Sequence, residues 1–123
     1  MTYRLVACGV AAICAALFAF LMLIPAAYPP LYGVESGAGA AFVGRRFSGF
    51  LLGLGAALWL ARDLPPGRGR DAVCFGVALA FTTTALTGVC TWLAGSAGPS
   101  ILGAAALELA VAAALVAVRR RPV

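Results

Sequence analysis

Three charged residues stand inside apolar stretches of the sequence, where a charge is costly. Glu108 lies about nine residues into the apolar run 100–118, which places it roughly 13 Å along a helix. Arg45 and Arg46 lie near the start of the apolar run 41–61. A carboxylate surrounded by apolar groups is strongly unfavourable unless it is paired, protonated or hydrated. We therefore expect one of the two arginines to be the partner of Glu108.

Two interpretations of these charges compete. In the structural one, an Arg–Glu pair fixes the second and fourth apolar segments in register. In the functional one, Glu108 titrates and serves a cation, a proton or a polar lipid headgroup. We favour the structural interpretation, because no second acid lies in an apolar run to form a relay. Arg46 is the preferred partner, since it lies three residues before Gly49 and shares its helix face.

The other residues that could do chemistry are four cysteines, and they form no close ligand pairs. All of them lie in apolar stretches, where a free cysteine behaves as a small hydrophobe. The sequence has no histidine, no paired carboxylates and no phosphate-binding loop. We therefore predict no catalytic residue, no metal site and no cofactor, and we do not expect an enzyme. The cysteines are Cys8, Cys14, Cys74 and Cys90.

The composition indicates a membrane protein. Of 123 residues, 63% are hydrophobic and 11% are charged, whereas soluble domains carry about 25% charged residues. A spanning helix needs roughly 20 mostly apolar residues, so four spans nearly use up the chain. We predict an all-α integral membrane four-helix bundle that forms one domain over residues 1–123. The expected spans are 5–27, 41–61, 72–94 and 100–118.

The arginines predict the orientation of the spans. Seven of them fall on the side of the termini and two on the other side. Because arginine is enriched in cytoplasmic loops, both termini are expected in the cytoplasm. The arginines sit at helix ends and form no continuous basic face, so we expect no binding to nucleic acid. The seven are Arg4, Arg62, Arg68, Arg70, Arg119, Arg120 and Arg121.

Small residues recur every four positions in three of the spans. Such stripes let helix backbones approach closely in a bilayer, where hydrophobicity alone does not hold helices together. They predict helix packing, either within one chain or between copies. We expect membrane lipid around the protein, and a homo-oligomer or a larger membrane protein complex as its assembly. The expected packing residues are Gly49, Gly53, Gly76, Ala80, Thr84, Gly88, Ala106 and Ala110.

Several short motifs together resemble a bacterial membrane family known as domain of unknown function 4345. They are Pro25, Leu31-Tyr32-Gly33, the stretch Arg46 to Gly55, Gly98-Pro99 and Glu108. The resemblance implies four spans in the bacterial cytoplasmic (inner) membrane and supports the Arg46–Glu108 pair. It implies no activity.

These patterns predict a non-enzymatic membrane protein that self-associates or serves as an accessory subunit of a larger membrane complex. The alternative is a small proton-coupled transporter, or a binder of lipid or another hydrophobic ligand, that uses Glu108. The small multidrug resistance family also has four spans and an intramembrane glutamate. That glutamate lies in the first span, whereas the first span here has no acid, which argues against the transporter.

Overall fold

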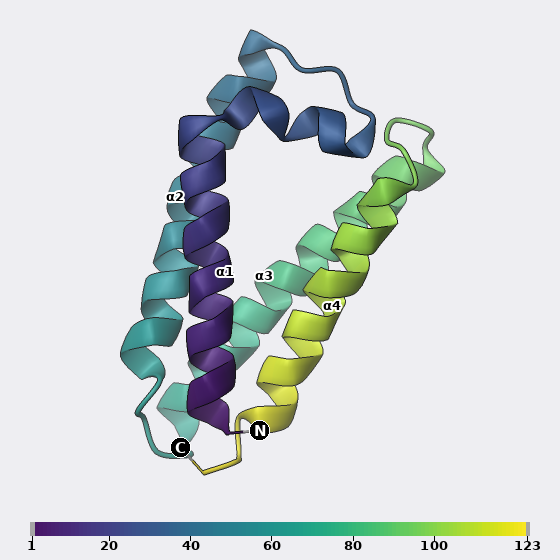
Figure 1. The fold of residues 1–123 in the computed structure, drawn as a ribbon. Coiled ribbons are helices and arrows are strands. Elements are labelled where there is room, and N and C mark those ends of the chain that lie inside the picture. The colour runs from purple at the N-terminus through teal and green to yellow at the C-terminus, as the bar shows by residue number, and fades with distance from the viewer. Residues whose placement is uncertain (1, 123) are drawn as a thin grey trace.

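The first helix, α1, covers Tyr3–Leu23 in the computed structural model, which describes residues 2–122 (Figure 1). The Thr2 hydroxyl caps the helix by accepting a hydrogen bond from the Leu5 N–H at 3.4 Å. The helix ends four residues earlier than expected, because Pro25 disfavours a helical conformation in the residue before it. Two short 3-10 turns follow, η1 (Pro25–Ala27) and η2 (Pro29–Tyr32).

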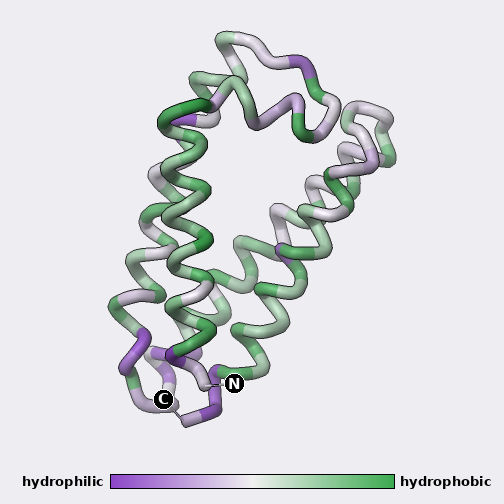
Figure 2. Tube along the Cα trace, viewed as in Figure 1, coloured by the Kyte–Doolittle hydropathy of each residue, from purple (hydrophilic) through white to green (hydrophobic). Residues whose placement is uncertain are grey.

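Three further long helices complete the chain: α2 (Ala38–Ala61), α3 (Arg68–Leu93) and α4 (Ser100–Val118). The prediction of an all-α protein with four helices long and apolar enough to span a membrane is confirmed. Helix α3 begins four residues before its expected span, because its first turn is polar and a hydropathy pattern does not reveal it. Polar segments gather near the ends of the helices (Figure 2).

The four helices pack as two antiparallel hairpins, α1 with α2 and α3 with α4 (Figure 1). In the first hairpin, a Cβ at Gly55 would lie 3.0 Å from the Cβ of Cys14 and 3.2 Å from the Ala11 carbonyl oxygen. In the second, a Cβ at Gly88 would lie 3.3 Å from the Ile101 side chain. Contacts between the two hairpins are much fewer than contacts within them.

The hydrophobic core lies in the half of the molecule that holds the termini. There the hairpins converge, and toward the other end they separate (Figure 1). The bundle is therefore closed at one end and open at the other. The core residues are Tyr3, Val6, Ala7, Val10, Ala11, Cys14, Leu58, Cys74, Val77, Ala78, Phe81, Val111, Ala112, Leu115 and Val118.

A buried arginine joins several chain segments at the closed end. Arg70 is 1% exposed, and its Nε donates to the Leu64 carbonyl at 2.8 Å. Its Nη1 donates to the carbonyls of Arg119 at 3.2 Å and Arg121 at 2.6 Å. The guanidinium lies 4.0 Å from the centre of the Tyr3 ring. Arg70 thus connects the α2–α3 loop, the C-terminal segment and the start of α1.

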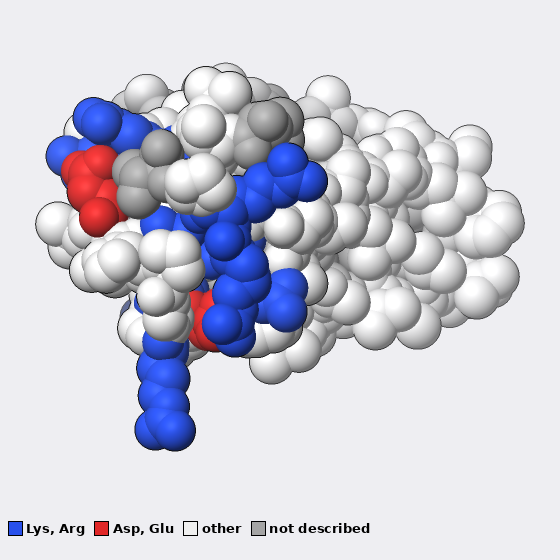
Figure 3. All heavy atoms as spheres, turned by 90° about the horizontal axis from the view of Figure 1, so that it is seen from below, with Lys and Arg blue, Asp and Glu red and all other residues white. Residues whose placement is uncertain are grey.

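Arginine side chains gather over the closed end of the molecule (Figure 3). Asp71 forms ion pairs with Arg119 at 3.8 Å and with Arg120 at 2.8 Å. Asp63 forms ion pairs with Arg4 at 3.5 Å and Arg62 at 3.4 Å. The two acids reduce the excess of positive charge at this end without cancelling it.

Residues 25–34, which we call the strap, cross the open end from the first hairpin to the second (Figure 1). The Gly98 N–H donates to the Tyr32 carbonyl at 2.6 Å. The Ser100 hydroxyl donates to the Leu31 carbonyl at 2.7 Å. Gly33 ends η2 with a φ of 68°, a left-handed conformation that suits glycine. The hairpins are therefore packed together in the closed half and linked by the strap at the open end, and they separate between these two regions.

Candidate functional site

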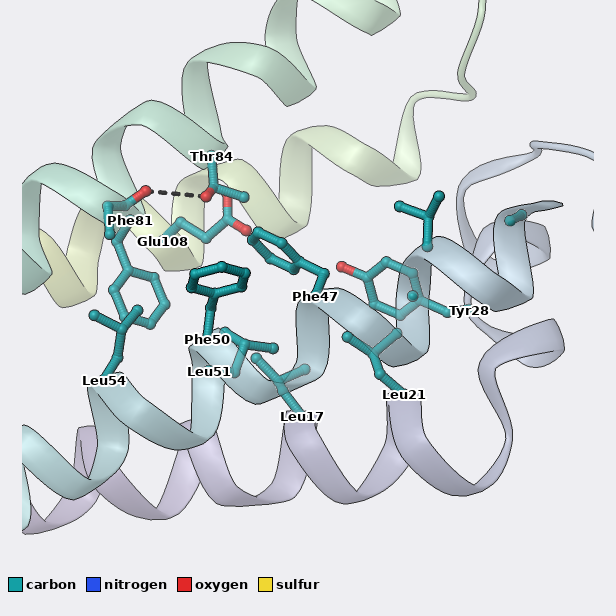
Figure 4. Close-up of a pocket in the computed structure, with 14 residues that line it drawn as sticks. Leu17, Leu21, Tyr28, Phe47, Phe50, Leu51, Leu54, Phe81, Thr84 and Glu108 are labelled. Carbon is teal, nitrogen blue, oxygen red and sulfur yellow. Dashed lines mark hydrogen bonds between the residues drawn. The ribbon is translucent and has the colours of Figure 1, made fainter.

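A cavity of about 420 Å³ lies between the two hairpins (Figure 4). All four helices contribute to its walls, and Tyr28 of the strap contributes as well. Almost all of the lining side chains are apolar. Those that the following argument uses are Phe47 and Phe50 from α2, Phe81 and Thr84 from α3, and Glu108 from α4.

Glu108 is the one charged residue among the described residues that line the cavity. Its side chain points from α4 into the cavity, toward the rings of Phe47 and Phe50 (Figure 4). The orientation follows from the packing of α4. Ala105 and Ala112 lie three residues before and four residues after Glu108, so they share its helix face. Both alanines are buried, and the glutamate between them therefore points inward.

The expected pair between Arg46 and Glu108 does not form, and neither does a pair with Arg45. Arg45 is exposed and donates from Nε to the Met22 carbonyl at 3.4 Å. Arg46 is also exposed and lies 5.7 Å from the centre of the Phe42 ring. Across residues 2–122, the acids found in ion pairs are Asp63 and Asp71.

The direction of the Arg46 side chain accounts for the missing pair. Helix α2 packs on α1, and it presents Phe47 and Phe50 to the cavity. Arg46 does not line the cavity. Its guanidinium lies against the ring of Phe42, one turn earlier in α2. The side chain therefore extends along α2 and not into the cavity.

The small-residue stripes make few contacts within the chain. Gly88 does pack closely, against Ile101. Ala80 and Thr84 line the cavity instead of a helix contact. The remaining positions face outward: a Cβ at Gly49, Gly53 or Gly76 would meet nothing within 4 Å, and Ala106 and Ala110 are exposed.

The cysteines are distributed between the core and the surface. Cys14 and Cys74 are buried in the core, Cys8 is half-buried and Cys90 is exposed. Gly55, which the stripes did not single out, makes the closest helix approach, directly against Cys14. Within the chain, a small residue is needed for close helix packing at Gly55 and not along the whole of each stripe.

The polar groups of the cavity are few, and most of them are acceptors. The Thr84 hydroxyl donates its hydrogen to the Ala80 carbonyl at 2.9 Å (Figure 4), so only its oxygen remains available. The Glu108 carboxylate offers two oxygens. Tyr28, outside the spanning helices, stays protonated because burial raises the pKa of its hydroxyl. The cavity thus suits a ligand with a long apolar part and one group that can donate hydrogen bonds.

The sequence pattern did not single out the aromatic residues of the cavity. Phe47 and Phe50 are three residues apart, a spacing that places them on one helix face. This spacing, directly after Arg45 and Arg46, could have indicated an aromatic helix face from the sequence. Tyr28 packs edge-on against Tyr32, with ring centres 5.2 Å apart.

The sequence matches no family model, and no curated protein and no solved structure matches it either. The resemblance to the domain of unknown function 4345 therefore stays a prediction. Over residues 2–122 the protein is all-α, and its four long apolar helices are suited to crossing a membrane.

Proposed function

We propose that this protein binds a hydrophobic, lipid-like ligand in the cavity between its two hairpins. The observation that carries the proposal is the cavity of about 420 Å³, with apolar walls and one acid. Its volume falls within the roughly 300–1,000 Å³ of typical ligand pockets. Such pockets are mostly apolar and hold a few polar groups that fix the orientation of the ligand. The cavity has this composition.

The position of the cavity supports access from the lipid. Its walls belong to helices long and apolar enough to cross a bilayer. The Phe50 side chain remains 70% exposed and that of Phe47 50% exposed, so the wall is open at the side. A ligand dissolved in the membrane can therefore reach the cavity without passing through water.

The test uses a photoactivatable probe in the membrane. The protein is placed in phosphatidylcholine nanodiscs and labelled with a neutral alkyl alcohol that carries a diazirine on its chain. Labelled residues are mapped by mass spectrometry. We expect saturable labelling of 47–54 and 80–84, which unlabelled dodecanol displaces. Labelling of lipid-facing residues should instead rise in proportion to probe concentration.

Adjacent threonines supply a matched pair of variants. Thr84 lines the cavity and Thr83 does not, although both are exposed and both donate to the carbonyl four residues earlier. Thr84→Phe should place a ring beside Glu108 and obstruct binding, which weakens the saturable labelling, while Thr83→Phe should leave it unchanged. Equal labelling of the wild type and the Thr84→Phe variant would contradict ligand binding in this cavity.

Self-association is the second candidate function, and the open face of α2 favours it. Gly49 and Gly53 leave space that a neighbouring helix could occupy. A homo-oligomer, or a larger complex with this protein as accessory subunit, would use that face. Native mass spectrometry of the protein in mild detergent should then show an oligomer that Gly53→Leu dissociates. A monomer at all concentrations would rule out the homo-oligomer.

The cellular location is a further part of the proposal, and it rests on the distribution of the arginines. We place the protein in the bacterial cytoplasmic membrane, with both termini in the cytoplasm. The concentration of arginines at the closed end supports this orientation (Figure 3).

A further inference from the structure

We infer that the ligand of this cavity is a cationic amphiphile, an alkyl chain with a protonated amine head that contacts Glu108. The inference rests on the proposed function, because it names the class of ligand for the same cavity. Three observations carry it: the missing partner of the carboxylate, the aromatic rings around it, and the excess of hydrogen-bond acceptors over donors in the cavity.

The first observation is the charge of the cavity. Glu108 is the one charged residue among the described lining residues. The sequence predicted that Arg45 or Arg46 would pair with this carboxylate. In the structure Arg45 contacts the Met22 carbonyl and Arg46 contacts the Phe42 ring. An ionised carboxylate among apolar groups is stabilised by a cation placed beside it. The same charge disfavours a ligand with an anionic phosphate head.

The second observation is the set of aromatic rings beside the carboxylate. The rings of Phe47 and Phe50 face Glu108 across the cavity, and the Tyr28 ring lies beyond Phe47 (Figure 4). An aromatic face carries negative potential, and it attracts a cation that lies within about 6 Å of the ring centre. The rings and the carboxylate therefore favour the same sign of ligand charge.

The third observation is the balance of donors and acceptors. The Thr84 hydroxyl already donates within α3, at 2.9 Å to the Ala80 carbonyl. The threonine oxygen and the two carboxylate oxygens remain as acceptors, and the Tyr28 hydroxyl is the one side-chain donor left among the described lining residues. An ammonium group has three donors and no acceptor, so it complements this set. An alcohol has one donor and complements it less fully.

The experiment is a competition against the saturable photolabelling described above. Dodecylamine and dodecanol share a chain length and differ in the head, so their ratio isolates the effect of the charge. We expect dodecylamine to displace the probe at lower concentration by at least about tenfold, the change that 1.4 kcal/mol produces. Glu108→Gln should remove this preference and leave dodecanol unchanged. The phosphatidylcholine of the nanodiscs carries no net charge.

The matched control is Glu35→Gln. Glu35 is an exposed acid outside the cavity, and its replacement changes the net charge equally. The preference for the amine should persist in this variant. Loss of the preference in Glu35→Gln as well as in Glu108→Gln would show a general charge effect and overturn the inference.

The outcomes separate the inference from the proposed function. Saturable labelling with no preference for the amine in the wild type overturns the inference and supports a neutral ligand. Persistence of the preference in Glu108→Gln also overturns it. Absence of saturable labelling in the wild type contradicts the proposed function itself.

A second variant covers the case in which Glu108→Gln does not fold. Phe50 is 70% exposed, so Phe50→Leu should preserve the fold and keep the carboxylate. Removing one aromatic face should reduce the preference for the amine by roughly two- to fivefold. A reduced preference supports the inference, and an unchanged one overturns the aromatic contribution on which it depends.

Discussion

Arg70 shows what one buried charge does when its hydrogen bonds are satisfied. The side chain is 1% exposed and donates to carbonyls of three different residues. Arg70→Gln should lower the free energy of unfolding by about 2–3 kcal/mol, because buried carbonyls lose charge-assisted hydrogen bonds. Titration with sodium dodecyl sulfate, followed by circular dichroism, measures the change.

The control for Arg70 lies two residues away. Arg68 is exposed and belongs to the same first turn of α3. Arg68→Gln should therefore leave the unfolding midpoint close to that of the wild type. Equal losses in the two variants would show that the charge of this helix end, and not the hydrogen bonds of Arg70, sets the stability.

Glu108 shows which part of a site can be predicted from the sequence. The position along α4 follows from counting residues, and its unusual character follows from the cost of a buried carboxylate. The absence of an arginine partner could not be predicted in this way, because spacing along the chain gives the depth of a residue and not the direction of its side chain. Phe47, one residue from the expected partner, takes the place facing the cavity.

At the scale of elements, Gly55 is a point where α1 and α2 approach closely. A Cβ there would lie 3.0 Å from the Cys14 Cβ and 3.2 Å from the Ala11 carbonyl oxygen. Neither atom belongs to the flexible end of a side chain. Gly55→Ala should therefore force the helices apart and cost about 1–3 kcal/mol. The unfolding midpoint in sodium dodecyl sulfate measures this cost.

Gly53 is the matched position on the same helix. A Cβ there would meet nothing within 4 Å. Gly53→Ala should be neutral or stabilise the helix by up to about 1 kcal/mol, because alanine is the better helix former. If Gly53→Ala destabilised the monomer more than Gly55→Ala, the exposed stripe would be the packing surface and this account of the hairpin would be wrong.

The strap makes a separate prediction. Gly33 has a φ of 68°, and an L-residue in that conformation costs roughly 1–2 kcal/mol. Gly33→Ala should weaken the hydrogen bond from the Gly98 N–H to the Tyr32 carbonyl. Hydrogen exchange at Gly98 should then accelerate by roughly 5- to 30-fold.

The control for the strap is Gly37→Ala. Gly37 precedes α2 in an extended conformation, with a φ of −151°, which any residue adopts. A Cβ at Gly37 would meet nothing within 4 Å. Exchange at Gly98 should be unchanged in this variant. Equal acceleration in both variants would show that the strap is not held by the turn at Gly33.

The helices themselves were largely predictable, because apolar runs of sufficient length determine them. The errors lie at their ends and have local causes. Pro25 ends α1 before the apolar run is complete, and the polar first turn of α3 precedes the run that marked it. Packing was less predictable than the helices, since the small residues are frequent enough to form stripes on faces that contact nothing within the chain.

At the scale of the whole molecule, the divergence of the hairpins creates the cavity. Buried side chains, most of them alanine, cysteine or valine, fill the closed half, whereas the strap holds the open end by hydrogen bonds to backbone carbonyls. The length of an apolar run predicts a spanning helix and not the position of its neighbours, so it does not show where helices meet and where they separate. The cavity, with the aromatic rings that line it, forms only when the two hairpins come together.

Orientation in the membrane is the last prediction, and it concerns the whole chain. The termini lie at the same end of the molecule, where the Tyr3 N–H donates to the Pro122 carbonyl at 3.4 Å. Seven of the nine arginines belong to this end. Acids contribute little to the positive-inside rule, so the pairs that Asp63 and Asp71 form there should not alter the result. A green fluorescent protein fused at the C-terminus should therefore fluoresce, and alkaline phosphatase fused there should be inactive. Phosphatase activity at the C-terminus would reverse the orientation and place the strap at the cytoplasmic face.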